Sequence, residues 1–132
     1  MAELAVVIVT WNVRDLVLDA IDTLLKDVEV NGPTTEVIVV DSASSDGSAD
    51  AIAAAFPRVR VIASEENLGF GRANNLALRA LGFGEPNAML PNAVYLLNPD
   101  TRTQPGATRT LYDSLLQTSR VGLVGARLSY GD

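Results

Sequence analysis

One apolar run near the start of the chain, Leu-Ala-Val-Val-Ile-Val over residues 4–9, restricts the fold most strongly. A strand with one face in water alternates apolar and polar residues, but this run contains no polar residue. It therefore predicts a strand buried on both faces, as in a parallel sheet covered by helices. Further mainly apolar runs of strand length follow at 37–40, 59–63, 93–97 and 121–124.

Helical patterns separate these five expected strands. Apolar residues recur every three or four positions in the first of them, and we expect Asn12 to cap it with Asp15 in the capping-box position. Ser45 or Asp46 is expected to cap the second helix. A third helix is expected over residues 73–81 and a fourth from Pro105 to about Thr118. Strand–helix alternation predicts an α/β three-layer sandwich with a mainly parallel sheet.

Length and composition exclude several classes of protein. The 132 residues fit a single domain spanning residues 1–132. The chain has no Cys and no His, which excludes disulfides, Cys/His zinc sites and His-dependent triads. Its net charge of −6 argues against a nucleic-acid partner. No apolar run approaches the ~20 residues needed to span a bilayer, so the expected location is the cytoplasm or the cytoplasmic face of the membrane.

Polar residues gather where the expected strands end. In parallel α/β sheets, ligands bind beyond the carboxyl ends of the strands, so these clusters are the candidate site. The candidates are Thr10, Trp11, Asn12, Asp41, Ser42, Asn67, Gly69, Arg72, Asn98 and Asp100.

Each of these residue types suits part of a nucleotide ligand. Trp11 either stacks on a flat base or fills the interface between helix and sheet. Asp41 either accepts a hydrogen bond from a base or ribose, or caps the following turn. Gly69 lets backbone amides approach a diphosphate, and Arg72 supplies a positive charge. Asp100 is the candidate ligand for Mg²⁺ or Mn²⁺, which need only one or two carboxylates beside substrate phosphates.

The segments that carry these residues resemble family 2 glycosyltransferases with the Rossmann-like GT-A fold, especially the rhamnosyltransferase-like branch. Five segments match in order and spacing over nearly the whole chain. They are Val-Val-Ile-Val-Thr-Trp-Asn at 6–12, Val-Val-Asp-Ser-Ala-Ser-Ser-Asp-Gly at 39–47, Glu-Asn-Leu-Gly-Phe-Gly-Arg-Ala-Asn-Asn at 66–75, Leu-Leu-Asn-Pro-Asp-Thr at 96–101 and Val-Gly-Leu-Val-Gly at 121–125.

The resemblance implies a donor-binding role. Residues 10–12 and the turn that starts at Asp41 would bind the base of a UDP- or dTDP-sugar, and the matched segment 66–75 adds Asn75 to the binding residues. Asn98-Pro99-Asp100 matches the DXD motif of the family, whose last Asp coordinates a divalent metal. The family fold inverts the anomeric centre by direct displacement, with an Asp or Glu base activating a hydroxyl of a saccharide or lipid-linked acceptor.

This sequence departs from the family pattern at several positions. Trp11 replaces the usual Tyr, Ser42 replaces Asp or Asn, and Asn98 replaces the first Asp of the DXD motif. Asn74 stands where many members have Arg.

The chain also ends soon after the fifth expected strand. We therefore expect a fold that is incomplete on its C-terminal side, with the catalytic base and most acceptor contacts outside this chain. Such a fragment would bind donor without transferring sugar, and its uncovered sheet edge would favour self-association.

Three other classes of protein compete with this interpretation. A dinucleotide-dependent dehydrogenase needs a glycine fingerprint directly after the first strand, where this chain has Thr10-Trp11-Asn12-Val13. A phospho-acceptor receiver domain needs an acidic pair at the same place, and the sequence has none there. A nucleotide-sugar-binding module without activity fits the same motifs and stays open.

Overall fold

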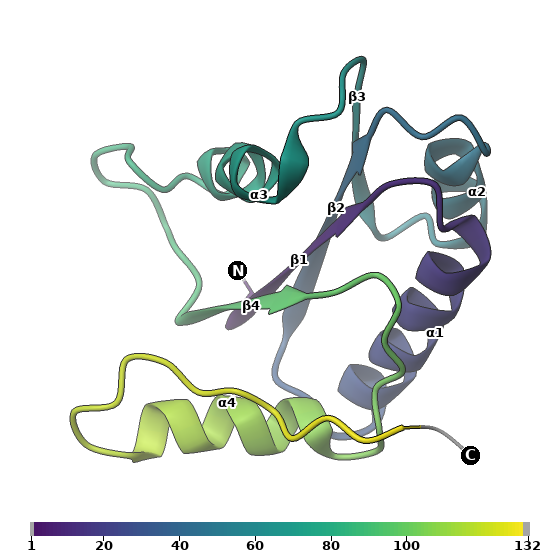
Figure 1. Ribbon diagram of the computed structural model, residues 1–132. Coiled ribbons are helices and arrows are strands. Elements are labelled where there is room, and N and C mark those ends of the chain that lie inside the picture. The colour runs from purple at the N-terminus through teal and green to yellow at the C-terminus, as the bar shows by residue number, and fades with distance from the viewer. Residues whose placement is uncertain (1, 131–132) are drawn as a thin grey trace.

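A parallel four-stranded sheet forms the centre of the computed structural model, which describes residues 2–130 (Figure 1). The strands are β1 (Leu4–Thr10), β2 (Thr35–Ser42), β3 (Arg60–Ser64) and β4 (Ala93–Leu97). Their order in the sheet is β3-β2-β1-β4, and every neighbouring pair is parallel. The expected α/β class and parallel sheet are therefore confirmed.

Helices cover both faces of the sheet. They are α1 (Arg14–Asn31), α2 (Ser48–Ala55), α3 (Gly69–Ala80) and α4 (Ala107–Gln117). The core with α1, α2 and α4 takes Val6 and Ile8 from β1, whereas the core with α3 takes Val7. Because successive residues of a strand point to opposite faces, the continuous apolar run supplies both cores at once.

The strand register brings the polar strand ends to one edge. Thr10 of β1 pairs with Asp41 of β2, and Asp41 in turn pairs with Ala63 of β3. On the other side of β1, Ile8 pairs with Leu97, the last residue of β4. Asn98 and the residues after it therefore leave the sheet at the edge where Trp11 leaves it.

The expected fifth strand over residues 121–124 is wrong. This segment has no regular secondary structure and follows α4 rather than the free edge of β4 (Figure 1). The side chain of Leu123 is 89% exposed. A segment of only four apolar residues forms a stable strand only when it is hydrogen-bonded to a neighbouring strand. Within residues 2–130 this segment has no such neighbour, so it stays irregular.

Two helices begin at other residues than expected. α3 begins at Gly69 rather than near Ala73, so part of the expected glycine loop is its first turn. α4 begins at Ala107, and Pro105 lies in the turn before it. Asn12 does not cap α1: the cap position belongs to Val13, and Asn12 adopts a left-handed backbone with φ 51°.

Across residues 2–130, no helix has the length and apolarity that crossing a bilayer requires.

The connection between β4 and α4 is held against α1 by three contacts. Arg102 forms an ion pair with Asp19 at 2.9 Å, and the Thr103 amide donates to the Thr23 hydroxyl at 3.0 Å. The third contact is the carboxylate of Asp27, which accepts hydrogen bonds from two amides at the start of α4. These contacts fix the path of the chain directly after Asn98-Pro99-Asp100.

Asp27 is the buried member of this group, and its removal should destabilise the fold. Its carboxylate accepts from the Gly106 amide at 2.6 Å and from the Thr108 amide at 3.0 Å. Asp27→Ala leaves both buried amides without a partner, so we expect the free energy of unfolding to fall by about 1–3 kcal/mol. Urea denaturation measures this change. The control Asp22→Ala removes an exposed ion pair with Lys26 and should cost under about 0.5 kcal/mol; equal losses would contradict the assignment.

Candidate functional site

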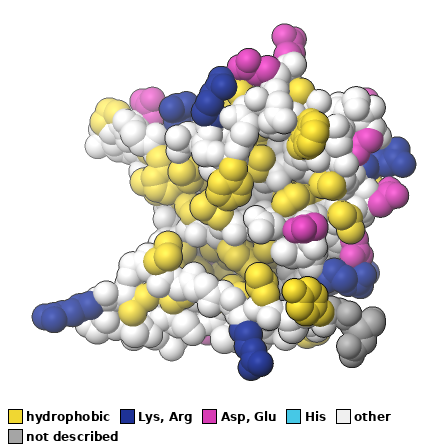
Figure 2. Space-filling view, viewed as in Figure 1, with side chains coloured by type: hydrophobic (Ala, Val, Ile, Leu, Met, Phe, Trp, Pro, Cys, Tyr) yellow, Lys and Arg dark blue, Asp and Glu magenta, His cyan; other side chains and the backbone are white. Residues whose placement is uncertain are grey.

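A cleft of about 460 Å³ lies at the carboxyl edge of the sheet. Three segments enclose it: the end of β1 with the start of α1, the ends of β2 and β3 with the start of α3, and the turn after β4. Figure 2 shows hydrophobic side chains across the middle of this face of the molecule, with Lys, Arg, Asp and Glu side chains mostly around its rim. The cleft residues are Val9, Thr10, Trp11, Val13, Leu16, Ser42, Asn67, Gly69, Phe70, Asn98, Pro99 and Asp100.

Seven residues predicted from the sequence line this one cleft. They come from all four strand-end segments and are Thr10, Trp11, Ser42, Asn67, Gly69, Asn98 and Asp100. The other four, Asn12, Asp41, Arg72 and Asn75, are absent from its lining.

Trp11 and Thr10 give the cleft an aromatic wall and an unpaired hydroxyl. The indole of Trp11 is 53% exposed, so it does not fill the interface between helix and sheet. Thr10 is 1% exposed, and its Oγ1 has no hydrogen-bond partner among the described residues. A buried hydroxyl without a partner costs about 1–3 kcal/mol.

Asp41 and Asn12 join the first two strand-end turns to each other. Asp41 is 4% exposed, and its carboxylate accepts hydrogen bonds from the Ser44 hydroxyl and from the Ser44 amide. The Ser44 hydroxyl accepts from the Asn12 amide at 2.9 Å, and the Asn12 side-chain oxygen accepts from the Ser45 amide at 2.7 Å. Asp41 thus stabilises its own turn, and Asn12 holds the chain directly after Trp11.

Asp46 connects the beginnings of two helices. Its carboxylate accepts from the Arg14 amide at 2.9 Å and from the Ser48 amide at 3.0 Å, the first residues of α1 and α2. The hydrogen bond from the Ser48 hydroxyl is the main reason that the pKa of Asp46 lies below its usual value. The expected cap of α2 is wrong, because Gly47 and neither Ser45 nor Asp46 occupies the cap position. The Asp46 carboxylate nevertheless accepts from the first amide of α2 and from the first amide of α1.

The polar residues around the start of α3 shape the loop after β3. The Ser42 hydroxyl accepts from the Leu68 amide at 3.0 Å, and the Asn67 side chain accepts from the Gly69 amide at 3.0 Å. Gly69 has φ +71°, a left-handed conformation that residues with a Cβ rarely adopt. This turn directs the first residues of α3 toward the cleft.

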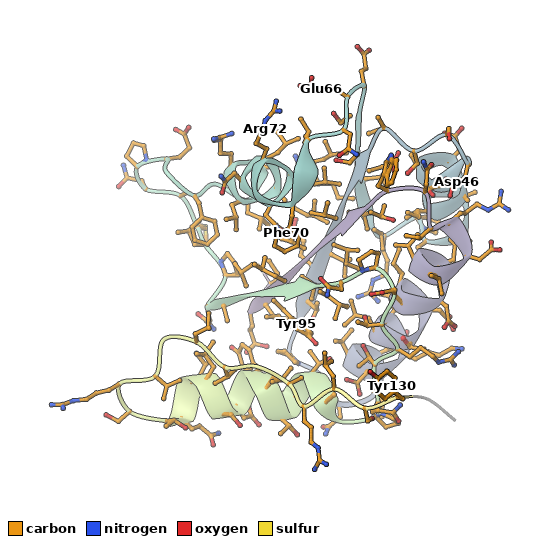
Figure 3. All side chains as sticks on the ribbon, in the orientation of Figure 1. Asp46, Glu66, Phe70, Arg72, Tyr95 and Tyr130 are labelled. Carbon is orange, nitrogen blue, oxygen red and sulfur yellow. The ribbon has the colours of Figure 1, made fainter. Side chains whose placement is uncertain are left out.

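Arg72 and Asn75 lie on α3 outside the cleft. The guanidinium of Arg72 pairs with the Glu66 carboxylate at 3.0 Å, and both side chains are exposed. In Figure 3 Arg72 extends away from the sheet, whereas Phe70 extends from α3 toward it. Arg72 is therefore not placed to contact a diphosphate beside Asp100 in this structure.

Asn98 and Asp100 are the oxygen ligands that the cleft offers to a cation. Both side chains are exposed, and Asp100 is the one carboxylate in the lining. Across residues 2–130, no three acidic, His or Cys side chains come together. The donor set fits Mg²⁺ or Mn²⁺ only if phosphate oxygens of a bound nucleotide supply further ligands.

Phe70 lines the cleft but is missing from the residues predicted from the sequence. It stands between two glycines in a polar strand-end segment, and an aromatic residue in such a segment was the reason for selecting Trp11. The same criterion applied to the third strand end would have found it.

This α/β fold with its parallel sheet is shared with solved glycosyltransferases of the GT-A fold. A mannosyltransferase from Pyrobaculum calidifontis, solved with GDP-Man and Mn²⁺, superposes with a TM-score of 0.70 at 24% identity, over 86% of this chain and 32% of its own. Glucosyl-3-phosphoglycerate synthase from Mycobacterium tuberculosis, solved with Mn²⁺, UDP and glucosyl-3-phosphoglycerate, gives 0.66 at 22% identity, over 89% and 41%.

Sequence comparison identifies the family. The family model described as Glycosyl transferase family 2 matches residues 5–132, and the chain belongs to this family. An N-acetylglucosaminyl-diphospho-decaprenol L-rhamnosyltransferase from Mycobacterium tuberculosis is 33% identical over 94 residues, which are 67% of this chain and 30% of that protein. The succinoglycan biosynthesis protein ExoO of Rhizobium meliloti is 39% identical over 75 residues, 56% of this chain and 21% of that protein. The chain thus spans less than a third of either curated relative.

The hydrogen bonds of Asp46 predict a pH-dependent contribution to stability. Because its pKa is lowered in the folded state, the contribution is present above the unfolded value near ~4 and is lost as the pH falls through the folded value. Asp46→Asn, which is neutral at every pH, should therefore lower the melting temperature at pH 7. The deficit should shrink as the pH is lowered below about 4.

Thermal unfolding followed by circular dichroism between pH 7 and pH 3 makes this measurement. The control Glu36→Gln, at an exposed position on β2, should follow the wild type throughout. A deficit for Asp46→Asn that is the same at every pH would contradict the charge-dependent role.

Proposed function

We propose that this domain binds a nucleoside-diphosphate sugar together with a divalent cation, as the donor-binding part of an inverting glycosyltransferase. The observation that carries the proposal is the cleft itself, which combines an exposed indole, a buried unpaired hydroxyl and a strand-end carboxylate. These three groups match the base, a polar group and the metal-bound diphosphate of one ligand.

We propose a role in donor binding for several groups of the cleft. Trp11 would stack on a uracil or thymine base, and Thr10 Oγ1 would bond to a polar atom of the nucleotide. In the turn after β4, Asp100 and the Asn98 amide oxygen would ligate Mn²⁺ or Mg²⁺ beside the diphosphate. When bound, the cation would neutralise negative charge on the diphosphate.

Sugar transfer also needs a base on the acceptor side of the donor. An acceptor hydroxyl loses its proton as it attacks, so a carboxylate must lie within hydrogen-bond reach on the side opposite the diphosphate. The strand-end carboxylates Asp41 and Asp46 accept hydrogen bonds from their own turns, and Asp100 is the proposed metal ligand. We therefore propose that the base and the acceptor contacts come from residues outside this domain.

The name of one relative suggests a class of acceptor. The mycobacterial relative is named for transfer of rhamnose to a sugar on decaprenyl diphosphate. We propose a lipid-linked saccharide acceptor for the enzyme that contains this domain, with transfer at the cytoplasmic face of the membrane.

Ligand binding should raise the melting temperature of the domain. We expect UDP or dTDP, with Mn²⁺ or Mg²⁺, to stabilise it because ligand that binds only the folded state shifts the unfolding equilibrium. At a hundredfold excess over the dissociation constant, the gain is about 2.7 kcal/mol. Differential scanning fluorimetry measures the shift. A shift with NAD and none with any nucleoside diphosphate would refute the donor site.

Substitution of Asp100 separates the metal contribution from the rest of binding. Asp100→Asn removes the single carboxylate in the cleft lining, so the increase in UDP affinity on adding Mn²⁺ should largely disappear. Because the side chain is exposed, stability should change by less than about 0.5 kcal/mol.

Isothermal titration with UDP, with and without Mn²⁺, gives the comparison. The control Asp50→Asn, exposed on α2, should keep the full effect of Mn²⁺. If Asp100→Asn also keeps it, Asp100 is not the ligand.

A further inference from the structure

Phe70 is a large aromatic side chain that the fold leaves open to the cleft. It lies in the first turn of α3 and is 59% exposed. It lines the same cleft as Trp11, and Figure 3 shows it extending from α3 toward the sheet. Other apolar residues of α3, such as Ala73 and Ala77, are buried against the sheet, so the helix does not need Phe70 for its own packing.

The backbone around Phe70 leaves room for a ligand. A Cβ built on either neighbouring glycine, Gly69 or Gly71, would meet no atom within 4 Å. The backbone on both sides of Phe70 is therefore open, and no side chain of a sequence neighbour covers the ring. An exposed ring in a site with open space around it can contact a ligand over much of its face.

Trp11 provides a second exposed ring from a different element. Its indole is 53% exposed and follows β1, whereas Phe70 belongs to α3, which packs on the opposite face of the sheet from α1. The cleft thus has two exposed aromatic residues, one directly after β1 and one in the first turn of α3. Two exposed rings in one cleft suit a flat ligand ring, because aromatic side chains stack on nucleotide bases.

We propose that Phe70 determines nucleotide affinity by contacting the base in the cleft that it shares with Trp11. This inference rests on the proposed function, because it requires a nucleotide in the cleft. The phenyl ring has neither charge nor hydrogen-bonding groups for a diphosphate, for which Asn98 and Asp100 are available. Its neighbours in the lining, Asn67 and Ser42, belong to the β2 side of the cleft, away from Asp100 across β1.

The test compares two probes that differ in the base. UDP with Mn²⁺ carries base and diphosphate, whereas inorganic pyrophosphate with Mn²⁺ carries the phosphates alone. Phe70→Ala should weaken UDP binding by about tenfold, a typical loss for one base–aromatic contact, and leave pyrophosphate binding unchanged. Phe70→Tyr keeps the ring and should bind UDP within about threefold of the wild type, since the aromatic face is retained.

Two further variants control for bulk and for surface apolarity. Phe70→Leu keeps an apolar side chain without a ring, so it should lose UDP affinity as Phe70→Ala does, even if the alanine variant folds poorly. Met89→Ala removes another exposed apolar side chain, in the loop before β4 and outside the cleft, and should bind both probes as the wild type does.

The outcomes separate this inference from the proposed function. Unchanged UDP binding by Phe70→Ala and Phe70→Leu, with the wild type binding UDP, would refute the role of Phe70 and leave the donor site intact. Equal losses for UDP and pyrophosphate would assign Phe70 to the structure of the cleft instead of the base. A wild-type domain that binds no nucleoside diphosphate would refute both.

Discussion

Everything in this domain depends on the position of β1, which is hydrogen-bonded to β2 on one side and to β4 on the other and is buried on both faces. A strand enclosed in this way has no place for polar side chains along its length, so they follow its end. Because the neighbouring strands run parallel to it, their polar ends reach the same edge. The cleft is therefore a direct consequence of how the apolar run is buried.

Side-chain carboxylates, hydroxyls and amides then give the strand-end turns a defined geometry. Asp46 accepts from the first amides of α1 and α2, while Asn12 and Ser44 join the turn that contains Trp11 to the turn after β2. The Asp27 carboxylate of α1 accepts hydrogen bonds from two amides at the start of α4. It thereby fixes the path of the chain that follows Asp100. Trp11 and Asp100 are themselves exposed, and their positions come from these neighbours. The turns around the cleft are therefore held by hydrogen bonds within the protein itself.

The sequence alone predicted the features that follow from burial and periodicity. Four of the five expected strands, the helices between them and the polar edge were identified because apolar runs and strand ends are local signals. The fifth strand was wrong, since an apolar run such as 121–124 becomes a strand only with a partner, and pairing is not encoded within the run.

The partners of the side-chain hydrogen bonds could not be predicted from the sequence either. Asn12 has the residue type and position of a helix cap, yet it bonds to Ser45 while Asp46 from the next turn serves α1. Arg72 lies close in sequence to the cleft residues but faces Glu66, because helical periodicity places it on another side of α3 than Phe70. The expected roles of the cleft residues come from the resemblance to the family. The hydrogen bonds that position those residues are visible only in the structure.

The central claim, that the strand-end cleft receives a nucleotide against Trp11, has a direct optical test. Trp11 is the single tryptophan of the chain, so its fluorescence reports on this cleft alone. The account predicts a saturable change in tryptophan emission when UDP is added with Mn²⁺, and none when NAD is added. Emission that stays constant while calorimetry detects UDP binding would contradict it, because the nucleotide would then occupy another part of the molecule.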